Sequence, residues 1–132
     1  MKRIVTVAAA LVVASSFSAF AEGDAVKGKK VFNKCKACHA VGEKAKNKVG
    51  PILNGVIDRE WGEVEGYKYS KPLLAGKEEG KVWDAATLDA YLIKPKDVIP
   101  KGKMAFAGLK KEADRQNVIA YLSGFNADGT EK

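Results

Sequence analysis

The side chains best suited to chemistry stand together near the N-terminal end of the chain. Cys35 and Cys38 are the only two cysteines, and His39, the only histidine, follows them directly. In a turn of helix, cysteines at this spacing project from one face, and the neighbouring imidazole can point to the same place. The trio therefore offers two sulfur nucleophiles and one metal ligand within a single turn. Such a set suits a redox pair, a metal site or a tether for a prosthetic group.

Four uses of this trio can be distinguished. A disulfide between Cys35 and Cys38 would close too small a loop to constrain the unfolded chain much, and it leaves His39 without a role. A thioredoxin-like pair is expected at a helix start after a strand, and no strand precedes Cys35. Zinc needs four ligands, and the trio supplies three. The run Cys35-Lys36-Ala37-Cys38-His39 matches the attachment motif of c-type haem, in which both sulfurs form thioethers and the histidine binds iron. We therefore expect one covalently bound haem c.

The first residues resemble an export signal. Lys2 and Arg3 precede an apolar run, 4–14, and small residues follow, ending in Ala19-Phe20-Ala21. This order is typical of a signal peptide cleaved after Ala21. The alternative is a membrane anchor, but the apolar run is shorter than the roughly 20 residues that cross a bilayer. We expect residues 1–21 to be removed, leaving one domain over residues 22–132 in the periplasm.

A second iron ligand is expected at Met104. The chain has two methionines, and Met1 would leave with the signal peptide. Met104 follows Pro100-Lys101-Gly102-Lys103 in a loop, where a flexible thioether can reach a haem without distorting a helix. The alternative role for Met104 is to fill the core. Histidine paired with methionine would raise the reduction potential and close both axial positions of the iron.

Helical periods and loops surround these residues. Asp24 is expected to cap a helix that runs to about Lys34, with Val26, Val31 and Phe32 on its inner face. Residues 40–69 show no sustained apolar period and are predicted to be loops. Four segments complete the domain: a short helix from Ser70 that ends at Gly76, a helix capped by Asp84 that ends before Pro95, a loop over Pro95 to Gly108, and a last helix over about Lys111 to Leu122, which Gly124 ends.

On these motifs, the chain resembles the class I cytochromes c, and among them the bacterial cytochrome c-two and mitochondrial-type carriers. The likeness covers residues 24–123. It implies an all-α fold in which the N- and C-terminal helices cross and in which helices and loops enclose the haem. The crossing is expected to bring together Gly28 and Phe32 of the first helix with Val118 and Tyr121 of the last.

The resemblance also implies roles for residues around the haem. The carbonyl of Pro51 would accept a hydrogen bond from the ligating histidine, which fixes its tautomer. Arg59, Tyr69 and Trp83 would lie near the haem propionates, and Tyr91 would lie beside the methionine ligand. Arg59, Tyr69 and Trp83 could each instead be an ordinary packing residue.

The chain is basic, with a formal net charge of +7. Seven lysines flank the segments expected around the haem edge: Lys34, Lys36, Lys48, Lys94, Lys96, Lys101 and Lys103. They could be a plain solvated face. A nucleic-acid surface is not expected in an exported chain without a binding motif. The further interpretation is electrostatic steering toward acidic docking surfaces, with fast dissociation.

The resulting functional prediction is a monomeric, soluble carrier of single electrons without enzymatic activity. The resemblance implies a membrane-bound cytochrome complex as donor, and an oxidase, reaction centre or periplasmic reductase as acceptor. Two alternatives stay open. One is an enzyme or sensor in which Met104 dissociates so that the iron binds peroxide or a gas. The other is a domain that serves one dedicated enzyme through a tight complex.

Overall fold

The structure is a computed structural model that describes residues 8–12 and 23–132. Its regular elements are helical, and the strand-like pairing within these ranges consists of isolated bridges, Glu60 with Val82 and Phe125 with Glu131. Six helical segments follow one another within the described ranges: α1 (Ala25–Val31), the 3-10 turn η2 (Phe32–Lys34), α2 (Lys71–Glu78), α3 (Ala85–Ile93), α4 (Pro95–Val98) and α5 (Glu112–Ser123). The all-α prediction is confirmed, and residues 40–69 form loops as expected.

The predicted signal peptide falls largely outside the described ranges, since only residues 8–12 of it are included. No helix within the described residues has the length and apolar character needed to cross a membrane.

Three helices begin at the residues predicted to start them, and each start has a side-chain cap. The carboxylate of Asp24 accepts from the backbone N–H groups of Val26 and Lys27. The Ser70 hydroxyl caps α2, and the Asp84 carboxylate accepts from the Thr87 N–H at 2.7 Å at the start of α3. Each cap satisfies backbone donors that have no partner inside the helix. The helix starts were thus encoded locally.

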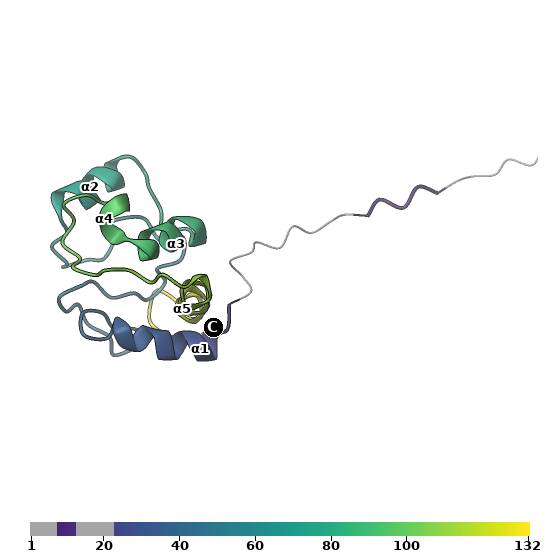
Figure 1. The fold of residues 1–132 in the computed structure, drawn as a ribbon, viewed down its shortest axis with the longest axis horizontal. Coiled ribbons are helices and arrows are strands. Elements are labelled where there is room, and N and C mark those ends of the chain that lie inside the picture. Colours follow the sequence, from purple (N-terminus) through teal and green to yellow (C-terminus); the bar gives the residue numbers. More distant parts are fainter. Residues whose placement is uncertain (1–7, 13–22) are drawn as a thin grey trace, which may run out of the picture.

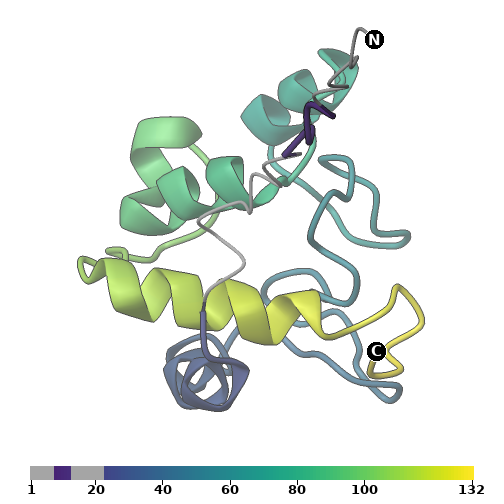
Figure 2. The same cartoon turned by 90° about the vertical axis from the view of Figure 1, so that its right-hand side faces the viewer.

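The first and last helices cross, and the crossing depends on a missing side chain. Figure 2 shows α5 running across the view, while α1 is seen along its axis. A Cβ atom at Gly28 would collide with the backbone carbonyl of Asn117. The rings of Phe32 and Tyr121 pack beside this point, with centroids 5.5 Å apart, and Val118 is buried. The predicted crossing is confirmed, except that Val26 points outward and is 74% exposed.

The prediction that Gly76 ends its helix is wrong. α2 continues to Glu78, and Gly80, with φ +75°, follows its end. Gly76 lies inside the helix because the ring of Trp61 packs flat against it, where a Cβ atom would collide with the indole. The glycine serves a tertiary contact, which outweighs the cost of about 1 kcal/mol that it brings to a helix interior.

The prediction of one loop from Pro95 to Gly108 is also partly wrong. Pro95 opens the single turn of α4, because its fixed φ suits the first helical position and its missing N–H costs nothing there. Figure 1 shows α2, α3 and α4 grouped at one end of the molecule, with α1 and α5 at the other. The segment between α4 and α5 carries Met104.

A buried ion pair fixes the end of this Met104 segment. Arg115 of α5 donates through Nε to the Asp89 carboxylate of α3 at 2.8 Å. Its Nη1 donates to the backbone carbonyls of Leu109 and Lys110, at 2.9 and 3.0 Å. The Leu109 N–H in turn donates to the carbonyl of Leu92 at 2.7 Å. The chain that follows Met104 is therefore tied to both α3 and α5.

Candidate haem site

The cysteine motif lies in a hydrogen-bonded turn that continues the first helix. The N–H groups of Cys38 and His39 both donate to the carbonyl of Cys35, at 3.1 and 2.9 Å. Both thiols are unpaired and half-buried, and burial raises the pKa of Cys35 above its ordinary value. Over the described ranges, no three or more histidine, cysteine or acidic side chains gather where they could hold a metal ion, so nothing there supplies zinc with its fourth ligand.

His39 is held in one tautomer. Its Nδ1 lies 2.7 Å from the carbonyl oxygen of Pro51. Because a carbonyl can only accept, Nδ1 carries the proton, and Nε2 of the neutral ring keeps its lone pair. Burial, with smaller contributions from the positive charges of Arg59 and Lys48, lowers the pKa of His39, although the bond to Pro51 opposes this. A neutral imidazole with a free Nε2 is the form that binds iron.

Gly50 makes room for this imidazole. A Cβ atom at Gly50 would collide with the His39 ring, and the glycine itself is buried. Its N–H donates to the carbonyl of Cys38 at 2.8 Å. The segment Gly50-Pro51 therefore supports the histidine on two sides, against the ring and at Nδ1.

Met104 has a hydrogen-bond partner on α3. The hydroxyl of Tyr91 donates to the Met104 sulfur at 3.4 Å. Burial raises the pKa of Tyr91 to about 12, so this hydroxyl stays protonated at neutral pH. A thioether sulfur has two lone pairs, and the one not engaged by Tyr91 can bind a metal. Met104 itself is only half-buried, so the sulfur is not enclosed within the protein core.

Two buried N–H groups lack acceptors within the described residues, Nε of Arg59 and Nε1 of Trp61. Nη1 of Arg59 donates to the carbonyls of Ile52 and Asn54, which fixes the guanidinium. Burial lowers the pKa of Arg59, and its electrostatic interaction with Tyr69 opposes that shift. A buried donor without a partner is costly, and a haem propionate is an acceptor that would satisfy Arg59. Together with the free thiols and the free Nε2, this donor fits a haem.

A stack of buried aromatic rings packs against Tyr91. Trp83 is buried between Trp61, with ring centroids 4.5 Å apart, and Tyr91, at 4.9 Å. Tyr69 accepts the N–H of Val64 at its hydroxyl. Sequence reasoning missed Trp61, because its contact with Gly76 forms only in the folded chain and Gly76 has the appearance of a helix stop.

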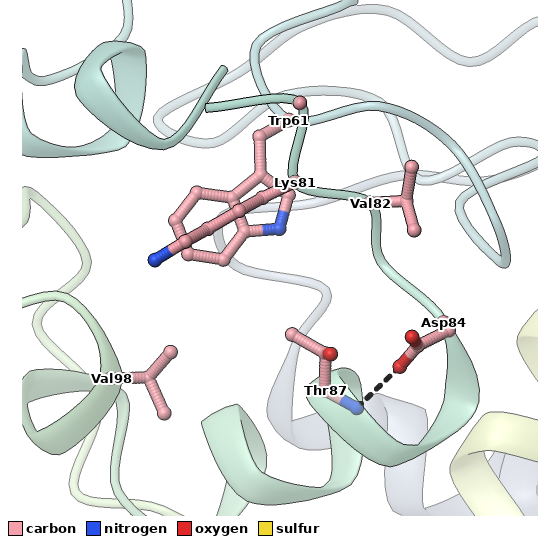
Figure 3. Close-up of a pocket in the computed structure, with 7 residues that line it drawn as sticks. Trp61, Lys81, Val82, Asp84, Thr87 and Val98 are labelled. Carbon is pink, nitrogen blue, oxygen red and sulfur yellow. Dashed lines mark hydrogen bonds between the residues drawn. The ribbon is translucent and has the colours of Figure 1, made fainter. Parts of the chain in front are cut away.

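One hollow in the described structure is separate from these ligand candidates. It measures about 390 Å³ and is lined by Trp61, Gly80, Lys81, Val82, Asp84, Thr87 and Val98. Figure 3 shows the Lys81 side chain lying across the indole of Trp61, and the Asp84 carboxylate engaged with the Thr87 N–H. The Asp84 carboxylate and the Lys81 ammonium of this hollow thus already serve helix capping and ring packing.

The five lysines predicted to dock partners are all exposed: Lys34, Lys36, Lys48, Lys96 and Lys103. Two of them also make contacts within the chain. Nζ of Lys48 donates to the carbonyl of Lys36, inside the cysteine motif, and Nζ of Lys103 donates to the carbonyl of Lys68, each at 2.7 Å. Nζ of Lys94, another of the seven lysines that flank the segments expected around the haem edge, lies 3.8 Å from Oδ1 of Asp97.

Comparison with known proteins agrees with the fold. The family model for cytochrome c matches residues 25–125, and the chain belongs to the cytochrome c family. Cytochrome c-550 of Ancylobacter novellus is 55% identical over 105 residues, which cover 80% of this chain and 98% of the relative. Cytochrome c2 of Rhodoblastus acidophilus is 51% identical over 109 residues, covering 83% and 99%.

The solved structures give the same result. Cytochrome c2 from Rhodospirillum centenum superposes with a TM-score of 0.75 at 42% identity, covering 79% of this chain and 99% of that one. Within its family, the chain is thus similar to the class I bacterial cytochromes c2. It is an electron carrier with one covalently bound haem c.

Proposed function

We propose that this chain is exported and works as a soluble periplasmic shuttle of single electrons. In this proposal Cys35 and Cys38 form the thioethers, and His39 and Met104 are the axial ligands of the iron. The observation that carries the proposal is that both ligands have an orienting hydrogen bond, from His39 to Pro51 at 2.7 Å and from Tyr91 to Met104 at 3.4 Å.

These contacts suit electron transfer without further chemistry. When bound, haem supplies an iron that alternates between the ferric and ferrous states. The Pro51 carbonyl keeps Nε2 of His39 unprotonated, and Gly50 keeps the imidazole ring in place. The Tyr91 hydroxyl draws electron density from the Met104 sulfur, which raises the reduction potential. With the iron held by both His39 and Met104, exogenous ligands would be excluded, and the proposed carrier would have no enzymatic role.

Export rests on residues 1–21. The matched family region begins at residue 25, and the relative from Ancylobacter novellus aligns over nearly its whole length while leaving a fifth of this chain unmatched. The start of the matched family region at residue 25 supports a separate N-terminal segment. After cleavage, the remaining domain, residues 22–132, is not expected to insert into a membrane.

The exposed lysines supply a means of finding partners. Lys34, Lys36 and Lys96 carry charges that make no side-chain hydrogen bond or ion pair within the described residues. The positive charges of these lysines attract acidic surfaces and speed the encounter with a partner. Because salt screens these charges, the complex also dissociates quickly. The proposed partners are a membrane-bound cytochrome complex as donor, and an oxidase, reaction centre or periplasmic reductase as acceptor. The carrier is proposed to be a monomer.

Two measurements separate this carrier from the alternatives. An iron held by both His39 and Met104 has no open position, so we expect that the reduced protein does not bind carbon monoxide. An enzyme or sensor in which Met104 dissociates would bind it. A shuttle also predicts that electron transfer to an acidic partner slows as ionic strength rises. A tight, salt-insensitive stoichiometric complex would instead indicate a domain dedicated to one enzyme and would contradict the proposal.

A further inference from the structure

Lys103, next to Met104, reaches across to a distant loop. Its Nζ donates to the backbone carbonyl of Lys68 at 2.7 Å, a contact between residues 35 positions apart. The same ammonium lies 5.0 Å from the centroid of the Tyr67 ring. A hydrogen bond from a charged donor and a cation–π contact therefore both join the Met104 segment to Tyr67 and Lys68.

Tyr67 continues the connection toward the other candidate ligand. Its hydroxyl donates to the carbonyl of Val49 at 2.7 Å. Val49 precedes Gly50, whose Cα packs against the His39 ring so closely that a Cβ atom would collide with it. The contacts thus run from Lys103 through Tyr67 to the segment that supports His39.

We infer that Lys103 and Tyr67 form a strap that holds the Met104 segment to the His39 segment. In this account Lys103 is a positioning residue for the methionine ligand, in addition to any contact with an acidic partner. The inference rests on the proposed function, because it takes Met104 to be the ligand that the strap keeps in place.

Neutral imidazole is the probe for this strap. Imidazole can bind the ferric iron only when Met104 dissociates, so its apparent affinity reports how often the methionine opens. Because the neutral probe carries no charge, changes in the surface charge of the protein do not steer it. The weak charge-transfer absorption of methionine sulfur on ferric iron reports the closed form directly.

Four variants of the holo-protein are compared with the wild type. Lys103→Met keeps the stem of the side chain and removes both contacts, and we expect imidazole to bind about tenfold more tightly, equivalent to about 1.4 kcal/mol. Lys103→Arg can still donate and should restore most of the wild-type affinity. Tyr67→Phe keeps the ring but loses the bond to Val49, and we expect a several-fold increase.

Lys71→Met is the matched control. It removes the same charge from an exposed lysine at the start of α2, one that makes no side-chain hydrogen bond or ion pair in the described structure, and its imidazole affinity should stay at the wild-type value. Equal affinities for Lys103→Met and Lys71→Met, with the charge-transfer absorption present, would overturn the strap alone. Absence of that absorption in the wild type would overturn Met104 ligation, and the strap with it.

Discussion

The Tyr91 hydroxyl donates to the sulfur of Met104 across 3.4 Å, and this bond joins α3 to the segment between α4 and α5. The tyrosine ring packs against Trp83, which in turn stacks on Trp61, so the donor has little freedom to turn away. A buried hydroxyl with a pKa of about 12 remains a donor throughout the neutral range. With Met104 as the proposed iron ligand, this contact would tune the iron without touching the metal.

Replacing Tyr91 by phenylalanine should lower the reduction potential. Without the hydrogen bond, the sulfur donates more electron density and favours ferric iron. A loss of about 0.5 to 1 kcal/mol corresponds to about 20 to 40 mV for one electron. A spectroscopic redox titration measures the shift. Tyr121→Phe is the control, because Tyr121 lies at the crossing of the terminal helices. The reduction potential of this variant should equal that of the wild type. A Tyr91→Phe potential equal to or above that of the wild type would contradict this role.

Gly50→Ala should weaken the support of His39. The added methyl group would meet the imidazole ring, so the ring or the backbone of the loop must move. We expect the free energy of unfolding to fall by about 2 kcal/mol, as is usual for overpacking. Urea unfolding of the holo-protein measures it. Gly124→Ala is a suitable control, since Gly124 has an ordinary φ of −76° and its added Cβ would come no closer than 3.3 Å to its nearest neighbour. Equal losses for both variants would argue against the contact.

Gly28→Ala tests the helix crossing in the same way. Alanine favours an isolated helix by about 1 kcal/mol over glycine. At Gly28, however, the methyl group would collide with the Asn117 carbonyl of α5, and we expect a net destabilisation of about 2 kcal/mol. Urea unfolding, followed by the helical circular dichroism signal, decides whether the free energy of unfolding rises or falls. A stabilised variant would show that α1 and α5 are not in such close contact.

The pair of Arg115 and Asp89 should be costly to break. Asp89→Asn leaves a buried guanidinium without its counter-charge, and removing one partner of a buried pair costs about 3 kcal/mol. Thermal unfolding and the charge-transfer absorption would both respond, because Arg115 also holds Leu109 and Lys110 after Met104. The exposed pair of Lys94 and Asp97 is the comparison, and Asp97→Asn should cost at most about 0.5 kcal/mol. Similar losses of stability in Asp89→Asn and Asp97→Asn would contradict the contribution assigned to the pair of Arg115 and Asp89.

Local signals in the sequence were sufficient for much of the fold and for the candidate ligands. Asp24, Ser70 and Asp84 mark helix starts because a capping side chain acts within three residues. The cysteine motif and its histidine lie within five residues of sequence. Such short-range arrangements can be read without knowing the rest of the fold.

Contacts between distant segments could not be read in this way. Gly76 has the appearance of a helix stop, and its real role depends on Trp61, which is fifteen residues away and packs on it only in the folded chain. The lysines at 48 and 103 read as free surface charges, because a bond from a side chain to a remote backbone carbonyl leaves no pattern in the sequence.

The most direct test of the account is the absorption spectrum of the ferric holo-protein, compared with that of Met104→Ala. The account predicts the methionine-to-iron charge-transfer absorption at full height in the wild type and its complete loss in the variant, with haem still covalently attached in both. Absence of that absorption in the wild type, or its persistence in Met104→Ala, would contradict ligation by Met104 and with it the closed iron on which the proposed shuttle depends.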